Sequence, residues 1–300
     1  MSLKLIRPVT VTDAVLTSHT IAENDFAAWS GATTYASGAQ VISTTTHRIY
    51  TSLQAGNLNH DPTNSANSAW WSNTSATNRW KMFDSSTGTQ TTTTTTFTVV
   101  VTPASVVNAI AFLNTNAANI VITMTDPIDG VVYSNTVYTA AAPLVGSWDS
   151  YFFDYITKKT NLFVEGLPSY ANATITVQFN NTGTVACGVM SFGRTVVLGD
   201  TQLGSSFGIV DYSQKTADSA GGYTVTQGAY SKKAEFSVWV DNGILDSVSQ
   251  MLTDFRATPA TWVGSSDYQG TFIYGFLRDW GVTLSYPSVS MVNITIEGLS

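Results

Sequence analysis

Ala173-Thr-Ile-Thr-Val-Gln-Phe179 decides the fold class of this chain, because apolar and polar residues alternate strictly along it. A period of two places the apolar side chains of a β-strand on one face, which packs on a core. Phe97-Thr-Val-Val-Val-Thr102 and Asn119-Ile-Val-Ile-Thr-Met124 are similarly rich in β-branched residues. Turn signals such as Asp126-Pro127 and Asp129-Gly130 separate these runs. Short strands with frequent turns predict a mainly β protein, a sandwich or a barrel.

One segment follows a helical period instead. Between Asp241 and Pro259, apolar residues recur at spacings of three and four: Ile244, Leu245, Val248, Met251, Leu252 and Phe255. Asp241 or Asn242 is in position to cap the start, and Pro259 lies just beyond the end. Strand-like runs flank this segment at 234–240 and 272–277. A β-sheet covered by one helix lets both elements bury their apolar faces.

The chain is poor in charged residues. Only 11% of its 300 residues are charged, against about 25% in typical soluble domains. Threonine, serine and asparagine replace them, and such a surface suits a chain covered by neighbours in an assembly. A secreted β-protein with a threonine-rich surface is the alternative. The net charge of −7 and the dispersed Lys and Arg residues exclude a basic surface for nucleic acid.

The single cysteine and the N-terminal residues indicate in which compartment the chain is made. Cys187 cannot form an internal disulfide, so we expect a buried, inert thiol. The first residues lack the long apolar segment of a signal peptide. No apolar run has the length of a membrane helix. We therefore expect synthesis in a cytoplasm and no membrane insertion.

The stretch Ser85–Thr96, which ends in a tract of six threonines at positions 91–96, is the one low-complexity segment. Threonine is β-branched and favours extended backbone. We expect an edge strand or an exposed connection here.

Aromatic residues crowd positions 26–83, a region otherwise made of Ser, Thr, Asn and Gly. The tryptophans and tyrosines among them are Trp29, Tyr35, Tyr50, Trp70, Trp71 and Trp80. Their order, with Gly38, Val41 and Asn57…Asp61-Pro62 between them, resembles the small chitin- and cellulose-binding modules of secreted hydrolases. Those modules read Trp, Tyr-x-x-Gly-Asp-x-Val, Tyr-x-(Cys/Ala/Ser), Asn-x-x-Pro and Trp. The resemblance spans roughly fifty residues by spacing alone.

The resemblance implies that aromatic rings of this module bind carbohydrate, because a flat ring buries the C–H face of a pyranose. The carbohydrate-binding candidates carried over are Trp29, Tyr35, Trp70 and Trp71. This chain departs from the pattern at Ala39-Gln40, where the family usually has an Asp, and this loss is expected to weaken the turn. A module of this size has little core, so several of the rings are expected to be core instead.

Residues 84–200 contain successive strand-like segments, including Ala109-Ile-Ala-Phe-Leu113. The run resembles galactose-binding-like (discoidin-type) jelly-roll sandwiches. This resemblance implies one β-sandwich made of residues 1–25 and 84–200, with the aromatic module at 26–83 inserted into it. Insertion at a loop tip costs little when the ends of the guest are close together. Residues 201–300 then form a C-terminal β-sheet domain with one α-helix.

The C-terminal third carries the most distinctive segments. They are Gly208-Ile-Val-Asp211-Tyr212, Tyr230-Ser-Lys232-Lys233 and Tyr274-Gly275-Phe-Leu-Arg278-Asp279-Trp280. With the helix, they resemble the ring-forming domains of phage tail and baseplate proteins, such as distal-tail proteins. This implies a virion structural protein at the tail tip, made in the host cytoplasm. Its implied partners are further copies in a cyclic homo-oligomer, other phage tail proteins and, through the module, host cell-surface polysaccharide.

No catalytic constellation is evident, so we expect a protein that is not an enzyme and that uses no metal or cofactor. His19, His47 and His60 do not have the spacing of metal ligands. Asp211 with Asp218, or Asp241 with Glu235, are carboxylate pairs that leave open a polysaccharide-degrading enzyme. That enzyme, or a bacterial surface adhesin, is the alternative function, and both require export from the cell.

Overall fold

The computed structural model describes residues 2–140, 158–217, 221–265 and 268–299 and the single positions 148 and 219. The strands are β1 (Ser2–Pro8), β2 (Leu16–His19), β3 (Thr34–Tyr35), β4 (Gln40–Ser43), β5 (Arg48–Ser52), β6 (Asn57–Leu58), β7 (Trp71–Ala76), β8 (Thr91–Val101), β9 (Ala109–Thr115), β10 (Asn119–Asp126), β11 (Gly130–Tyr138), β12 (Leu162–Glu165), β13 (Thr174–Thr201), β14 (Ser206–Asp211), β15 (Gln214–Ala217), β16 (Tyr223–Thr226), β17 (Tyr230–Asp241), β18 (Ala260–Val263), β19 (Phe272–Thr283) and β20 (Val289–Gly298). Within these described ranges, the helices are α2 (Leu245–Asp254) and three short 3₁₀ turns, η1 (Ser65–Asn67), η2 (Lys81–Phe83) and η3 (Gln269–Thr271). The predicted mainly β class is confirmed.

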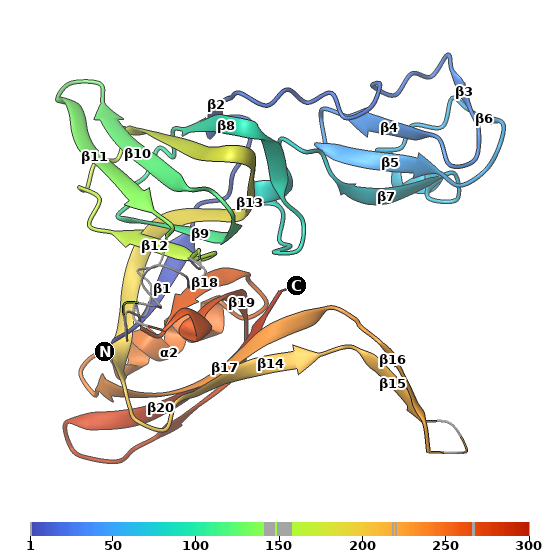
Figure 1. Cartoon of the computed structure of the whole chain (residues 1–300). Coiled ribbons are helices and arrows are strands. Elements are labelled where there is room, and N and C mark those ends of the chain that lie inside the picture. The colour runs from blue at the N-terminus through green and yellow to red at the C-terminus, as the bar shows by residue number, and fades with distance from the viewer. Residues whose placement is uncertain are drawn as a thin grey trace.

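The strand β13 is the spine of the molecule. Its 28 residues pair first with β8 and β10, then with β9, and finally with β1 and β17. The alternation that predicted a strand is present in its first half, where Ile175, Val177 and Phe179 are fully buried. Because β13 runs through both halves of the protein, it joins the sandwich to the C-terminal sheet (Figure 1).

The sandwich core lies between β8, β10 and β13 on one side and β9 and β12 on the other (Figure 1). Three phenylalanines meet there: Phe179 stacks on Phe97 with centroids 4.5 Å apart and meets the edge of Phe112 at 5.4 Å. Cys187 is buried in the same cluster, and its burial raises the pKa of the thiol far above the usual range. The threonine tract forms the start of β8, where Thr91–Thr94 pair with β13.

The C-terminal half is a sheet in the order β1-β18-β19-β20-β17-β14 with α2 packed on it, as predicted. The expected cap was wrong. Asp241 Oδ1 accepts a hydrogen bond from the Gly243 amide at 2.7 Å, and the side-chain amide of Asn242 donates to Tyr286 and Pro287, so neither caps the helix. The helix begins after Ile244, which makes no side-chain cap.

Strand β1 differs from the expected grouping of residues 1–25 with the sandwich. It pairs with β18 as well as β13, and Leu3 and Leu5 lie in the C-terminal core. Only β2 of this segment pairs inside the sandwich, with β8. The long-range partner of an isolated apolar strand is not encoded in its own pattern, which explains the difference.

Two features stand apart from these cores in Figure 1. The aromatic module, with its sheet β4-β5-β7 and the pair β3-β6, lies beside the sandwich. In the C-terminal half, the hairpin of β14 and β17 continues as β15 and β16 and projects away from the C-terminal sheet. Every residue of β15 and β16 is exposed.

Candidate functional site

Trp71 forms the centre of the module core. Its side chain is only 4% exposed and packs with Val41 and Tyr50. Its indole Nε1 donates to the backbone oxygen of His60 at 2.7 Å. The Tyr35 ring meets it edge-on, with centroids 5.2 Å apart and planes at 68°. A ring buried in these contacts leaves no face exposed on which a sugar could stack, so Trp71 belongs to the hydrophobic core of the module.

The other three candidates, Trp29, Tyr35 and Trp70, lie half-buried around that core. The Trp29 amide donates to the Ile42 oxygen at 3.0 Å, which holds this residue beside β4. The Ser30 amide donates to the Tyr35 hydroxyl oxygen at 2.8 Å. The structure therefore gathers the three residues in one small module, with their rings partly open to solvent.

A histidine covers one face of Trp70. The imidazole of His60 stacks on the indole with centroids 3.9 Å apart and planes at 12°. His60 is held by Asn57, whose Oδ1 lies 3.1 Å from His60 Nδ1. Asn57 is fully buried, and its amide donates to Ser52 Oγ at 3.0 Å. Trp70 therefore offers at most one ring face to a ligand, a restriction that sequence spacing did not indicate.

The turn at Ala39 forms without the acidic residue of the resembled family. The Ala39 amide donates to the Ala36 oxygen at 3.1 Å, and the Gly38 amide donates to the Ser52 oxygen at 2.7 Å. Gly38 has a φ of 84°, a conformation that glycine adopts without strain. Backbone hydrogen bonds and one glycine thus replace the missing side chain.

A cluster around His47 attaches the module to the sandwich. His47, in the turn between β4 and β5, stacks on Trp80 of the sandwich core. Its Nδ1 lies 3.1 Å from Glu23 and its Nε2 lies 3.2 Å from Asp13. Glu23 also accepts a hydrogen bond from Thr77 Oγ1 at 2.8 Å. Both connections between module and sandwich, before and after it in the chain, therefore meet at this histidine.

The carboxylates considered for hydrolysis have structural partners. Glu235 pairs with Lys233 at 2.6 Å, and this ion pair lowers the pKa of its carboxyl. Hydrogen bonds from Ser213 and Lys215 lower the pKa of Asp211. Asp218 lies outside the described residues.

No group of three or more His, Cys, Asp or Glu side chains within the described ranges is placed to hold a metal ion. No helix in that part of the chain has both the length and the apolar character to cross a membrane.

No protein-family model matches this chain, and no curated protein matches it. Among solved structures, it is similar to chitosan-binding module 1 of a chitosanase/glucanase from Paenibacillus sp. IK-5. The two are 12% identical, the TM-score is 0.25, and the match covers 38% of this chain and 81% of that module. A likeness at this level carries no argument about the ligand of this chain.

Proposed function

We propose that this chain is a structural protein of a phage particle that assembles into a ring at the tail tip or baseplate. In this proposal, the hairpin arm (residues 206–230) makes the contact between copies, and the aromatic module binds polysaccharide on the host surface. The exposed apolar residues of the hairpin arm carry the proposal.

Six large side chains of the hairpin arm are each more than half exposed. They are Phe207, Ile209, Tyr212, Tyr223, Val225 and Tyr230. An isolated two-stranded hairpin is at best marginally stable in water, and apolar side chains gathered on a surface mark interaction sites. The arm contains only three charged residues, Asp211, Lys215 and Asp218. A surface this apolar and this weakly charged favours burial against another protein.

The edges of the large sheet favour a further copy of the same chain as the protein that covers the arm. The strand order runs from β11 at one end to β14 at the other. β11 also has exposed apolar residues, Val131 and Tyr138. A contact that joins one surface of a copy to a different surface of the next copy is heterologous. Such contacts close into a ring when the rotation between neighbouring copies is a whole fraction of 360°. Strand addition at an edge supplies main-chain hydrogen bonds for such a contact.

Light scattering after size-exclusion chromatography tests the arm. The parent chain is expected to elute as one oligomer of defined mass, and the double variant Tyr223→Ser with Val225→Thr is expected to elute as single copies. Leu284→Ser is the matched control, because Leu284 is equally exposed but lies outside the arm. A double variant with the parent mass would exclude the arm as the contact.

A separate assay distinguishes this proposal from a polysaccharide-degrading enzyme. The purified chain is incubated with chitin, peptidoglycan and capsular polysaccharide, and reducing ends are measured. We expect no increase over buffer. Turnover that disappears when one carboxylate is replaced would overturn the structural assignment.

A further inference from the structure

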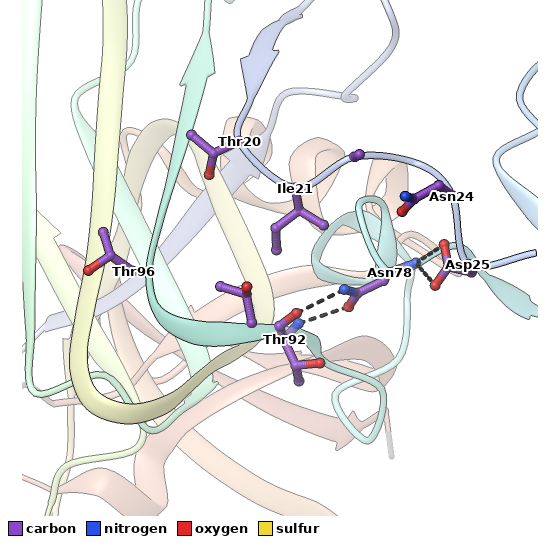
Figure 2. A pocket seen from close by; sticks show the side chains of 9 residues that line it. Thr20, Ile21, Asn24, Asp25, Asn78, Thr92 and Thr96 are labelled. Carbon is purple, nitrogen blue, oxygen red and sulfur yellow. Dashed lines mark hydrogen bonds between the residues drawn. The ribbon is translucent and has the colours of Figure 1, made fainter.

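A polar cavity of about 460 Å³ lies where the module joins the sandwich (Figure 2). The connection before the module lines it with Thr20, Ile21, Ala22, Asn24 and Asp25, the connection after the module adds Asn78, and β8 adds Thr92, Thr93 and Thr96. Its volume falls within the range of small-ligand pockets, roughly 300–1,000 Å³. The ring cluster of the module (Trp29, Tyr35, Trp70 and Trp71) and the hairpin arm contribute no residue to it.

Hydrogen bonds fix the walls of this cavity. Both carboxylate oxygens of Asp25 accept a hydrogen bond from the backbone N–H of Asn78, at 3.1 and 3.2 Å. The Asn78 side chain pairs with the backbone of Thr92 in both directions, at 2.8 and 2.9 Å. Figure 2 shows these contacts as a continuous chain from Asp25 through Asn78 to Thr92. The connecting segments and β8 are therefore held together before any ligand arrives.

Several polar groups in the cavity remain available to a ligand. Across the part of the chain that the structure describes, the side chains of Asn24, Thr92 and Thr93 have no hydrogen-bond partner in the protein. A carboxylate has about four lone-pair sites, so Asp25 keeps acceptor capacity beyond its bonds to Asn78. Asn24 supplies donors and an acceptor, and each threonine hydroxyl supplies both.

This set of groups favours a neutral, polyhydroxylated ligand. Each hydroxyl of a sugar is both donor and acceptor, which matches the amide, hydroxyls and carboxylate of the cavity. No Lys or Arg occurs among its described lining residues, so nothing there attracts an anion. Asp25 is the single carboxylate among them, whereas Ca²⁺ takes six to eight oxygen ligands. Ile21 adds an apolar side chain against which a sugar C–H face can pack.

We infer that this junction cavity is a saccharide-binding site that holds one sugar residue by its hydroxyls, separate from the aromatic surface of the module. Asn24, Asp25 and Thr93 are the groups that contact the sugar. The inference goes beyond the proposed function, which assigns glycan binding to the module rings alone.

Saturation-transfer difference NMR tests this site on the full-length chain. N-acetylglucosamine, galactose, glucose and rhamnose are titrated one at a time. We expect at least one to bind with a Kd on the order of millimolar. Asn24→Ala and Thr93→Val each remove one hydrogen-bonding group, so each weakens binding about 3- to 10-fold. Thr93→Val keeps the β-branched shape that the strand requires.

Two matched variants separate the cavity from its surroundings. Thr94→Val changes the next residue of the same tract, and Asn73→Ala changes an exposed asparagine of β7; neither residue lines the cavity. Both are expected to bind like the parent, and so is Trp70→Ala. The inference is overturned if none of the four sugars binds, if Asn24→Ala and Thr93→Val bind like the parent, or if Trp70→Ala alone abolishes binding. None of these results depends on whether the chain forms a ring.

Discussion

The imidazole of His47 lies flat on the indole of Trp80, with ring centroids 3.9 Å apart and planes at 18°. His47 belongs to the module, whereas Trp80 belongs to the core cluster of the sandwich. Carboxylates of Glu23 and Asp13 lie beside its two ring nitrogens. This one side chain therefore connects the module to the rest of the protein through stacking and polar contacts together.

His47→Ala is expected to loosen the module without unfolding the sandwich. The substitution removes an aromatic contact and the partner of two carboxylates, a loss of about 1–3 kcal/mol. Limited proteolysis measures the effect, with faster cleavage expected in the connections at 20–26 and 77–80. His60→Ala is the control, because its stack on Trp70 lies within the module. Equal cleavage rates for His47→Ala and the parent would contradict this role.

The buried His19 is expected to make the protein less stable in acid. Burial, and secondarily the nearby Arg79, lower its pKa from 6.5 to about 4. Between these values the unfolded chain takes up a proton that the folded chain does not, so stability falls as the pH drops from 6.5 toward 4. The loss is at most about 3 kcal/mol.

Urea unfolding at pH 7 and pH 4.5 measures this loss. His19→Asn, whose Oδ1 takes the place of Nδ1 as acceptor for the Ile21 amide, is expected to show a smaller difference between the two pH values. An unchanged difference would assign the acid sensitivity to other groups.

Trp71→Ala is expected to unfold the module, because truncating a buried tryptophan costs about 3–5 kcal/mol. Loss of protease resistance confined to residues 26–83 is the measurement. A stable module that no longer binds polysaccharide would instead make Trp71 a binding residue.

Trp70→Ala is expected to keep the module folded and to weaken retention on insoluble polysaccharide roughly 3- to 10-fold, because a half-buried ring loses mainly its stacking on the sugar. Trp239→Ala, at an exposed tryptophan of the C-terminal sheet, is the control. Chitin and cellulose pull-downs provide the measurement. If Trp70→Ala is retained like the parent on every polysaccharide that the parent binds, the Trp70 ring does not stack on the sugar.

The local sequence pattern predicted the individual strands and the helix better than it predicted which strands pair with one another. The alternation at 173–179 and the helical spacing at 244–255 are properties of the chain alone, and both elements form. The length of β13 depends on contacts with strands far away in sequence, as does the place of β1 in the C-terminal core. No local spacing contains such partners.

The same limit applies to the candidate site. Trp70 and Trp71 are adjacent and identical in type, yet Trp71 begins β7 facing the core and Trp70 precedes the strand. Only the fold distinguishes them. The stack of His60 on Trp70 and the junction cavity also depend on distant segments meeting. Trp29, Tyr35, Trp70 and Trp71 do form one aromatic cluster. Trp80, which composition grouped with them, lies in the sandwich core instead, and composition did not reveal which ring of the cluster is core.

Negative-stain electron microscopy of the purified chain tests most directly whether it is an assembly protein. The exposed hairpin arm and the two sheet edges predict closed rings of one uniform diameter. Fields of single, separate molecules at the protein concentration used for the light-scattering measurement would contradict that prediction.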